Sequence, residues 1–239
     1  MRSTQLDLKS YDTDKIAHKY LARYDPLFAP LVDQPVNLLE LGVFRGGSVR
    51  LWRDYFPNGK VVGVDLNVPP GLENEPRITL YQGSQDDAAL LNRIAAEHAP
   101  GGFDVVIDDA SHIGTLTKAS FDILFDRHLK AGGWYVIEDW PTGYLEDWHD
   151  GVAPRATPSR RERLARWLLG VRTPPLKRPW PTHSYGLVGF VKDLIDEQAA
   201  ATATCRVLGG VPLRDTRFES MLVTPTILFI KKRSDAPGG

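Results

Sequence analysis

The sequence predicts an α/β protein built on a doubly wound sheet, and three observations lead to this expectation. Short apolar runs alternate with helical stretches from residue 36 onward, several runs end in glycine or an acidic residue, and two further apolar runs lie near the end of the chain. Fully apolar strands separated by helices are typical of a parallel sheet that is covered on both faces. In such a sheet, ligands bind at the carboxyl ends of the strands.

The expected elements follow this alternation. Parallel strands are expected at 36–42, 60–66, 77–83, 103–109 and 134–139. Helices are expected at 49–56, 86–99, 116–129 and 186–200. The glycine pair Gly132-Gly133 is expected to stop the third helix before the fifth strand. The runs 218–224 and 226–232 are separated only by Pro225, which predicts an antiparallel hairpin that closes a sheet of seven strands.

Residues 141–183 interrupt the alternation and hold seven prolines. The stretch is too long for an ordinary loop and is expected to be an inserted lid, with one short helix at 160–170. Residues 1–239 as a whole are expected to form a single domain with this insertion.

Composition excludes several classes of protein. A chain of 239 residues, 42% of them hydrophobic, can bury a core without disulfides, and its single cysteine, Cys205, argues for a reducing compartment. The net charge of −1 gives no global signal for nucleic acid or a membrane surface. No apolar run approaches the roughly 18 residues of a membrane span, and the N-terminus lacks a signal-peptide core. We therefore expect a cytoplasmic protein with neither nucleic acid nor membrane as partner.

A glycine-rich turn, ELGVFRGGS at 40–48, follows the first strand. Its spacing differs from the G-x-G-x-x-G of pyrophosphate binders, and Glu40 would repel a pyrophosphate but could receive a cationic ligand. Asp65 ends the second strand, where an acid can accept both hydroxyls of a ribose, and GSQ at 83–85 follows the third strand. This set resembles the class I S-adenosylmethionine-dependent methyltransferases. The resemblance implies a site for S-adenosylmethionine at Glu40, Gly42, Gly46, Ser48, Asp65, Ser84 and Gln85. The alternative is a glycine turn and a surface acid in another α/β fold.

Two acidic pairs, Asp108-Asp109 and Glu138-Asp139, end the fourth and fifth strands. They would repel each other without a cation, and a cluster of oxygen ligands suits a hard ion such as Mg²⁺. Asp109, Glu138 and Asp139 are the candidate ligands, and Asp108 is expected to face the amino group of the cofactor. His112 would lie beside the metal in a helical turn and take the proton of a metal-bound hydroxyl. The alternative is that the acids are helix caps or solvated loops and that His112 bonds only its own turn.

Several motifs in order carry a narrower resemblance: TDK at 13–15, HKY at 18–20 with Tyr24, ELGVFRGGS, GVDL at 63–66, YQGSQDD at 81–87, VIDDASH at 106–112 and VIEDW at 136–140. Together they resemble the macrocin/mycinamicin-type sugar O-methyltransferases of natural-product pathways. Related actinobacterial enzymes, including the methylmannose polysaccharide 1-O-methyltransferase kind of mycobacteria, methylate polysaccharides, and this small chain is similar to that kind.

The resemblance implies a Rossmann-like class I methyltransferase sheet that uses S-adenosylmethionine and Mg²⁺. It implies metal ligands at Asp109, Glu138 and Asp139, with His112 as the general base. It also implies that the segment 10–32 folds over the cofactor, with Lys15 and Tyr20 near it. Larger members carry an additional N-terminal domain, whose contribution to the site is expected to be missing here.

Aromatic residues of the insertion are candidates for contact with the acceptor, because aromatic rings can stack on the apolar faces of sugars. The candidates are Trp140, Tyr144, Trp148, Trp180 and His183. The alternative is that these rings pack a small core of the insertion itself. The stretch 155–178 holds eight basic residues against one acidic residue. A solvated helix face is the favoured interpretation, and an anionic acceptor, a partner subunit or RNA are the alternatives.

The sequence thus predicts an S-adenosylmethionine- and Mg²⁺-dependent O-methyltransferase. Its acceptor would be a hydroxyl of a sugar, an oligo- or polysaccharide, or a glycosylated natural product, and a homodimer is compatible with the sequence. The alternatives are a catechol-type O-methyltransferase, a non-catalytic cofactor-binding module and an RNA-modifying enzyme.

Overall fold

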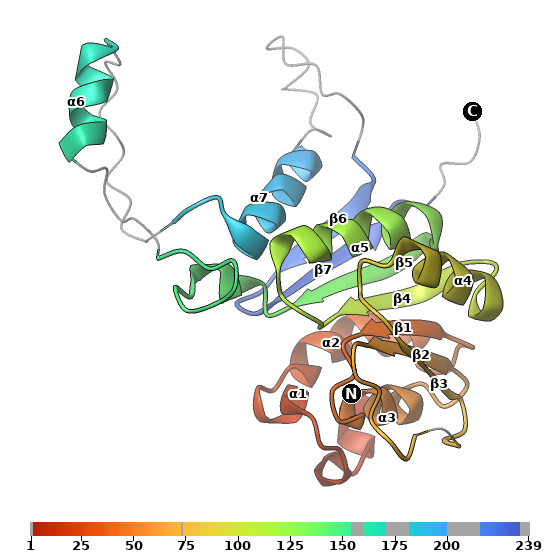
Figure 1. Cartoon of the computed structure of the whole chain (residues 1–239). Coiled ribbons are helices and arrows are strands. Elements are labelled where there is room, and N and C mark those ends of the chain that lie inside the picture. The colour runs from red at the N-terminus through yellow and green to blue at the C-terminus, as the bar shows by residue number, and fades with distance from the viewer. Residues whose placement is uncertain (1, 73, 154–159, 171–181, 200–215, 235–239) are drawn as a thin grey trace, which may run out of the picture.

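The structure is a computed structural model that describes residues 2–72, 74–153, 160–170, 182–199 and 216–234 (Figure 1). Within these residues a seven-stranded sheet has the order β3-β2-β1-β4-β5-β7-β6. Its strands are β1 (Asn37–Leu41), β2 (Lys60–Asp65), β3 (Ile78–Gln82), β4 (Phe103–Asp108), β5 (Leu129–Glu138), β6 (Phe218–Val223) and β7 (Ile227–Lys232). Strands β1 to β5 pair in parallel, whereas β7 is antiparallel to both β5 and β6. The predicted doubly wound sheet with a closing hairpin is confirmed.

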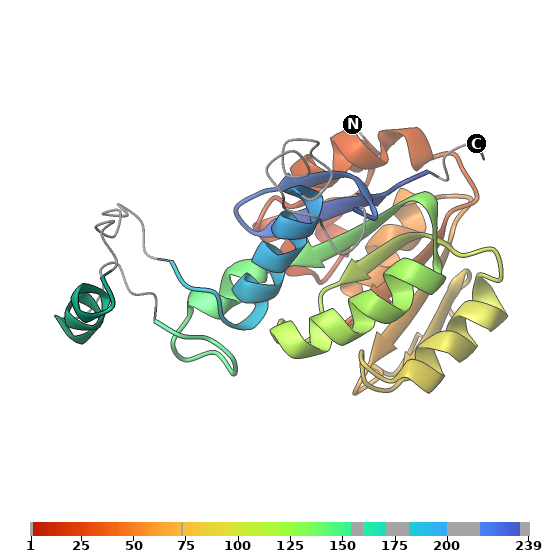
Figure 2. The same ribbon diagram turned by 90° about the horizontal axis from the view of Figure 1, so that it is seen from above.

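The helices cover the sheet in two layers (Figure 1). One layer contains α1 (Asp14–Ala17), α2 (Leu21–Phe28) and α3 (Gly47–Tyr55), and the other contains α4 (Ala88–His98), α5 (Gly114–Arg127) and α7 (Gly186–Ala199). The helix α6 (Arg160–Leu168) stands apart from the sheet in both views (Figure 2). Short 3₁₀ turns lie at Arg2–Gln5, Leu8–Ser10, Ala29–Leu31 and Trp140–Tyr144.

Each layer buries its own apolar cluster against the sheet. Beneath α4, α5 and α7 the cluster includes Leu91, Phe121 and Phe125, while the opposite face is rich in aromatic residues such as Tyr24, Phe28 and Trp52. Burial of each large side chain contributes about 1.5–3 kcal/mol, so both faces hold the strand ends firmly in place.

The expected element boundaries are confirmed to within a few residues, with one correction. The predicted helix 116–129 begins earlier, at Gly114, and ends at Arg127, and β5 already starts at Leu129. Gly132 and Gly133 therefore lie inside a strand instead of stopping a helix. They fall where the β4–β5 register jumps, and Gly132 has a φ of 73°, so the glycines permit a bulge that an L side chain would strain.

Register brings the functional strand ends to one edge of the sheet. Leu41 pairs with Val64 on one side and with Asp108 on the other, and Asp108 pairs with Ile137. The residues that follow these positions therefore emerge side by side, as a doubly wound sheet requires.

Candidate functional site

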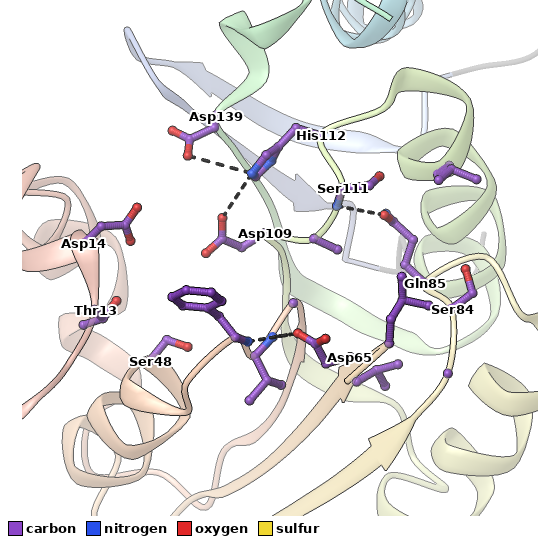
Figure 3. Close-up of a pocket in the computed structure, with 18 of the residues that line it drawn as sticks. Thr13, Asp14, Ser48, Asp65, Ser84, Gln85, Asp109, Ser111, His112 and Asp139 are labelled. Atoms are coloured by element: carbon purple, nitrogen blue, oxygen red, sulfur yellow. Dashed lines mark hydrogen bonds and ion pairs between the residues drawn. The ribbon is translucent and has the colours of Figure 1, made fainter. Parts of the chain in front are cut away.

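A cavity of about 670 Å³ opens at this edge of the sheet (Figure 3). Eight residues predicted for the cofactor, the metal or catalysis line it: Gly42, Ser48, Asp65, Ser84, Gln85, Asp109, His112 and Asp139. Its volume lies within the roughly 300–1,000 Å³ typical of small-molecule sites. Residues that are distant in the sequence thus meet around one cavity.

Gly42 is required by a close approach of two backbone segments. Its φ is 88°, and a Cβ placed there would lie 2.1 Å from the carbonyl oxygen of Asp109. Gly46 caps α3 with a left-handed φ of 83°, which an L side chain would strain, but it does not line the cavity. The two glycines therefore shape the turn, and only the first reaches the cavity.

Backbone donors hold the Asp65 carboxylate in place. Its Oδ2 accepts from the amides of Val43 (2.7 Å) and Phe44 (2.9 Å), and its Oδ1 accepts from the amide of Asn67 at 2.9 Å. Each carboxylate oxygen can accept a further hydrogen bond, so the group can still receive ligand hydroxyls. Phe44, which sequence reasoning missed, also lines the cavity with a left-handed φ of 49°.

The structure corrects the position of Asp108. This residue is 1% exposed and does not line the cavity, because successive residues of a strand point to opposite faces and Asp108 points toward α5. It accepts from Ser120 Oγ at 3.0 Å and from Gln85 Nε2 at 3.1 Å. Burial raises the pKa of Asp108 to about 6. Asp108 thus orders Gln85 from below, and Gln85 in turn accepts from the amide of Ser111 at 3.0 Å.

Asp109, His112 and Asp139 form a compact group on one wall of the cavity (Figure 3). One ligand atom from each lies within 4.8 Å of the others. His112 Nε2 is 3.9 Å from Asp109 Oδ1 and 4.0 Å from Asp139 Oδ2. His112 and Asp139 have left-handed φ values of 54° and 51°. Strain of this kind concentrates at functional sites.

His112 reaches this position from a loop and not from the helical turn that was predicted, since α5 begins only at Gly114. Thr142 donates from its hydroxyl to the carbonyl oxygen of His112 at 3.3 Å, and the ring of Trp148 has its centroid 5.9 Å from that of His112. The loop is therefore held by the segment that follows β5.

A buried lysine supplies a cation within the acidic cluster. Lys15, fully buried, places its Nζ 2.5 Å from Asp109 Oδ2, 2.9 Å from Glu138 Oε2 and 3.7 Å from Glu40 Oε1. Burial opposes the charge of Lys15, but attraction to Asp109, Glu138 and Glu40 raises its pKa well above the usual value. The repulsion expected between the acids is thus partly balanced by the chain itself.

Two predicted acids, Glu40 and Glu138, lie beneath the cavity and do not line it. Glu40 accepts from Ser48 Oγ (2.8 Å) and Trp52 Nε1 (3.0 Å), so the cation that it receives in the structure is Lys15. Glu138 accepts from Lys15 and from the hydroxyl of Tyr24 and does not join the group of Asp109, His112 and Asp139. Burial raises the pKa of Glu40 to about 7 and that of Glu138 to about 8, although Lys15 acts in the opposite direction on both.

The start of the N-terminal segment forms part of the cavity wall. Asp12, Thr13 and Asp14 line the cavity, whereas Lys15 and Tyr20 lie behind it. The Tyr20 hydroxyl donates to Asp139 Oδ1. Sequence reasoning placed Lys15 and Tyr20 near the cofactor, but no sequence pattern assigned them to individual carboxylates.

Trp140, Tyr144 and Trp148, at the start of the insertion, do not line the cavity. Trp140 donates from Nε1 to the carbonyl oxygen of Thr224 at 2.9 Å, and the rings of Tyr144 and His183 are 4.7 Å apart. These contacts join the start of the insertion to the turn between β6 and β7 and to the segment that precedes α7. Trp180, and the basic stretch outside 160–170, lie outside the described residues.

The strand order, the cavity and the acids at its edge define a class I methyltransferase fold. Structural comparison agrees, because the chain aligns with MycE, a methyltransferase of the mycinamycin biosynthetic pathway solved with Mg, SAH and mycinamycin VI. The TM-score is 0.65 at 31% identity, over 91% of this chain and 50% of MycE. No family model matches the chain.

The curated relatives of the chain include sugar O-methyltransferases of macrolides and tetracenomycins, which confirms the resemblance to the macrocin/mycinamicin-type enzymes. The chain is 44% identical over 146 residues to the 8-demethyl-8-(2-methoxy-alpha-L-rhamnosyl)-tetracenomycin-C 3'-O-methyltransferase of Streptomyces olivaceus, covering 58% of this chain and 36% of that protein. It is 31% identical over 229 residues to the 8-demethyl-8-alpha-L-rhamnosyl tetracenomycin-C 2'-O-methyltransferase of the same organism, covering 93% of this chain and 52% of that protein. The chain thus spans about half the length of these relatives or less. Among its described residues, no helix is both long and apolar enough to cross a bilayer.

Proposed function

We propose that the protein is an S-adenosylmethionine- and Mg²⁺-dependent O-methyltransferase that methylates a sugar hydroxyl. The observation that carries the proposal is the meeting of two predicted sets of residues around one cavity: Asp65 and Gln85 at one end, and Asp109, His112 and Asp139 at the other. The similarity to sugar O-methyltransferases supports the same reaction class.

The cavity fits the proposed cofactor. Asp65 keeps acceptor capacity toward the space and would receive the ribose hydroxyls, while Ser84 and Gln85 would border the adenine. Gly42, which no larger residue could replace, brings the backbone close to the ligand. Ser48 and the N-terminal residues Thr13 and Asp14 would enclose the remaining part.

The donor chemistry also fits Mg²⁺. Asp109 and Asp139 each turn one carboxylate oxygen toward the same space, and carboxylate oxygens are the ligands that Mg²⁺ prefers. The imidazole of His112 is a poorer ligand for so hard an ion. We therefore assign Asp109 and Asp139 to metal binding and keep His112 for proton transfer. Glu138 would reach the ion only after exchanging its bonds to Lys15 and Tyr24.

When bound, the sulfonium cofactor supplies the methyl group, and Mg²⁺ orients the acceptor hydroxyl and lowers its pKa. The protein's own task is to take the acceptor proton at His112 Nε2. That nitrogen lies about equally far from Asp109 and Asp139, and both negative charges stabilise the imidazolium that forms. The ring of Trp148 lies beside the imidazole, with the two centroids 5.9 Å apart.

The acceptor would be a sugar, an oligo- or polysaccharide, or a glycosylated natural product. Trp148 beside His112, with Tyr144 and His183 further along the insertion, supports a large acceptor. The lid role of 141–183 and the acceptor role of Trp140, Tyr144, Trp148, Trp180 and His183 remain predictions, as does a homodimer.

Methyl transfer from labelled S-adenosylmethionine would test this function. Oligomannosides, rhamnosyl and macrolide glycosides, and catechols would be supplied in parallel, with and without Mg²⁺. We expect Mg²⁺-dependent labelling of one of the glycosides. Turnover of catechols alone would favour the catechol-type enzyme, and tight cofactor binding without transfer to any acceptor would favour a non-catalytic module.

A further inference from the structure

The N-terminal segment, defined here as residues 12–24, contacts the acids at the metal edge through three of its side chains. Lys15 binds Asp109, Tyr20 donates to Asp139, and Tyr24 donates to Glu138. Lys15, Tyr20 and Tyr24 are all buried. A short stretch of chain thus contacts acids that lie on two separate strand ends.

These contacts determine which carboxylate oxygens face the metal site. Lys15 engages Oδ2 of Asp109, which leaves Oδ1 as the oxygen nearest His112, at 3.9 Å. Tyr20 engages Oδ1 of Asp139, which leaves Oδ2 facing His112 at 4.0 Å. One oxygen of each acid is therefore held by the N-terminal segment, and the other is turned toward the space where an ion would bind.

The same segment forms part of the wall around the cofactor cavity. Asp12, Thr13 and Asp14 line that cavity, and Lys15 follows them directly in α1. The Asp12 backbone packs so closely on the first turn of α3 that a Cβ on Gly47 would lie 2.0 Å from the Asp12 carbonyl oxygen. Movement of the cavity wall would therefore also disturb the contacts to the acids.

We propose that Lys15 and Tyr20 are positioning residues for Asp109 and Asp139, and that the N-terminal segment thereby couples the metal site to the cofactor cavity. The proposal rests on the proposed function. Hydrogen bonds to ligating carboxylates fix the orientation of these groups before the metal binds. Less entropy is then lost when the metal binds. An ion that fixes both acids in turn favours the arrangement in which Lys15 and Tyr20 contact them. Because coupling between sites is reciprocal, Mg²⁺ tightens cofactor binding by the factor by which the cofactor tightens Mg²⁺ binding.

Two matched tyrosine variants test the proposal. Tyr20→Phe removes only the hydroxyl that holds Asp139, whereas Tyr11→Phe removes a tyrosine–carboxylate bond just before the same segment, to Asp54 of α3. Calorimetry would measure the Kd of Mg²⁺ alone, and the Kd of S-adenosylhomocysteine with and without Mg²⁺. We expect about a 10-fold loss of Mg²⁺ affinity in Tyr20→Phe and none in Tyr11→Phe. In the wild type Mg²⁺ should lower the Kd of S-adenosylhomocysteine about 5-fold or more. In Tyr20→Phe the ratio of the two Kd values, without and with Mg²⁺, should fall toward 1.

Amide hydrogen exchange gives a readout that is independent of turnover. Mg²⁺ alone should slow exchange over residues 12–24 in the wild type and in Tyr11→Phe, but much less in Tyr20→Phe. Equal Mg²⁺ affinity in Tyr20→Phe and the wild type would overturn the proposal. The proposal would also be overturned if the wild type bound S-adenosylhomocysteine with the same Kd with and without Mg²⁺. A wild-type protein that shows this coupling but transfers no methyl group would instead refute the proposed function and leave the inference standing.

Discussion

Several features of His112 fit the proposed role of general base. It occupies a left-handed backbone conformation, faces two carboxylates and keeps 14% of its side chain exposed toward the cavity. Its hydrogen bond from Thr142 involves the backbone and not the ring. Within the described structure the imidazole nitrogen Nε2 instead faces the two carboxylates, which fits the proposed transfer of the acceptor proton to it.

Replacement of this ring should separate binding from chemistry. In His112→Ala we expect unchanged affinity for S-adenosylhomocysteine and a methyl-transfer rate lower by about 10²–10⁴-fold, the range typical of general-base catalysis. His98→Ala is the matched control, because His98 bonds Tyr81 and does not line the cavity. Stopped assays with a saturating acceptor would measure both rates. Equal turnover of His112→Ala and the control would exclude His112 as the base.

Glu40 offers a prediction about pH. Burial raises the pKa of Glu40 to about 7, above its ordinary value of 4.5, so the folded state binds a proton that the unfolded state has already released. The stability that this group contributes is therefore present at pH 4 and lost as pH rises through 7. Glu40→Gln lacks this titration. Between pH 5 and 8 the wild type should lose about 2–3 kcal/mol more unfolding free energy than Glu40→Gln, as urea titrations at each pH would show. Parallel pH profiles of the two proteins would contradict the assignment.

At the scale of elements, the sequence was a good guide wherever local pattern decides structure. Apolar runs and helical spacing located all seven strands of the described sheet. The signal is strongest in β1, β2 and β4, where burial on both faces imposes continuous hydrophobicity. Asp108 shows the limit. Asp108 is the last residue of β4 and Asp109 follows it. Only the direction of the strand's alternation, which depends on register with β1 and β5, decides which carboxylate reaches the cavity. The prediction that Gly132 and Gly133 stop a helix was wrong for a similar reason, because a bulge depends on the neighbouring strand.

The start of α5 depends on a residue that is distant in the sequence. Its first turn has no side-chain cap of its own, and Asp150 of the insertion accepts from the Gly114 amide at 2.6 Å. Helix α4 is capped locally instead, by Asp87, which accepts from Ala89 and Leu90 at 3.0 Å each. Asp150 therefore joins the insertion to the loop that carries His112.

This pair of caps allows a matched comparison. Asp150→Ala and Asp87→Ala should each lower the free energy of unfolding by about 1 kcal/mol, the usual value of a helix cap. Only Asp150→Ala should also slow methyl transfer, because it loosens the loop between β4 and α5. Urea unfolding and initial rates would be measured on both variants. A loss of activity in Asp87→Ala of the same size would show that general destabilisation, and not the position of His112, explains the effect.

At the scale of the whole molecule, the net charge of −1 conceals a strong local imbalance. Glu40, Asp109, Glu138 and Asp139 meet at one edge, and Lys15 is the cation among them in the described structure. Lys15 is separated from Asp109 by 94 positions and from Glu138 by 123. Composition and spacing could predict that the acids need a cation, but only the folded chain shows that a lysine supplies part of it. The remaining imbalance favours a divalent ion.

A ligand that binds only the folded state raises its stability, so the two ends of the cavity can be distinguished by heating the whole protein. At 100 times its Kd a ligand adds about 2.7 kcal/mol, which corresponds to a rise in Tm of about 5–10 °C for a chain of this size. Mg²⁺ should give such a rise in the wild type and in Asp65→Asn, but not in Asp139→Asn, because only Asp139 lies in the metal group. S-adenosylhomocysteine without Mg²⁺ should still stabilise Asp139→Asn and should lose most of its effect on Asp65→Asn. If Asp65→Asn lost both shifts, or if the Mg²⁺ shift survived in Asp139→Asn, the division of the cavity into a ribose end and a metal end would be wrong.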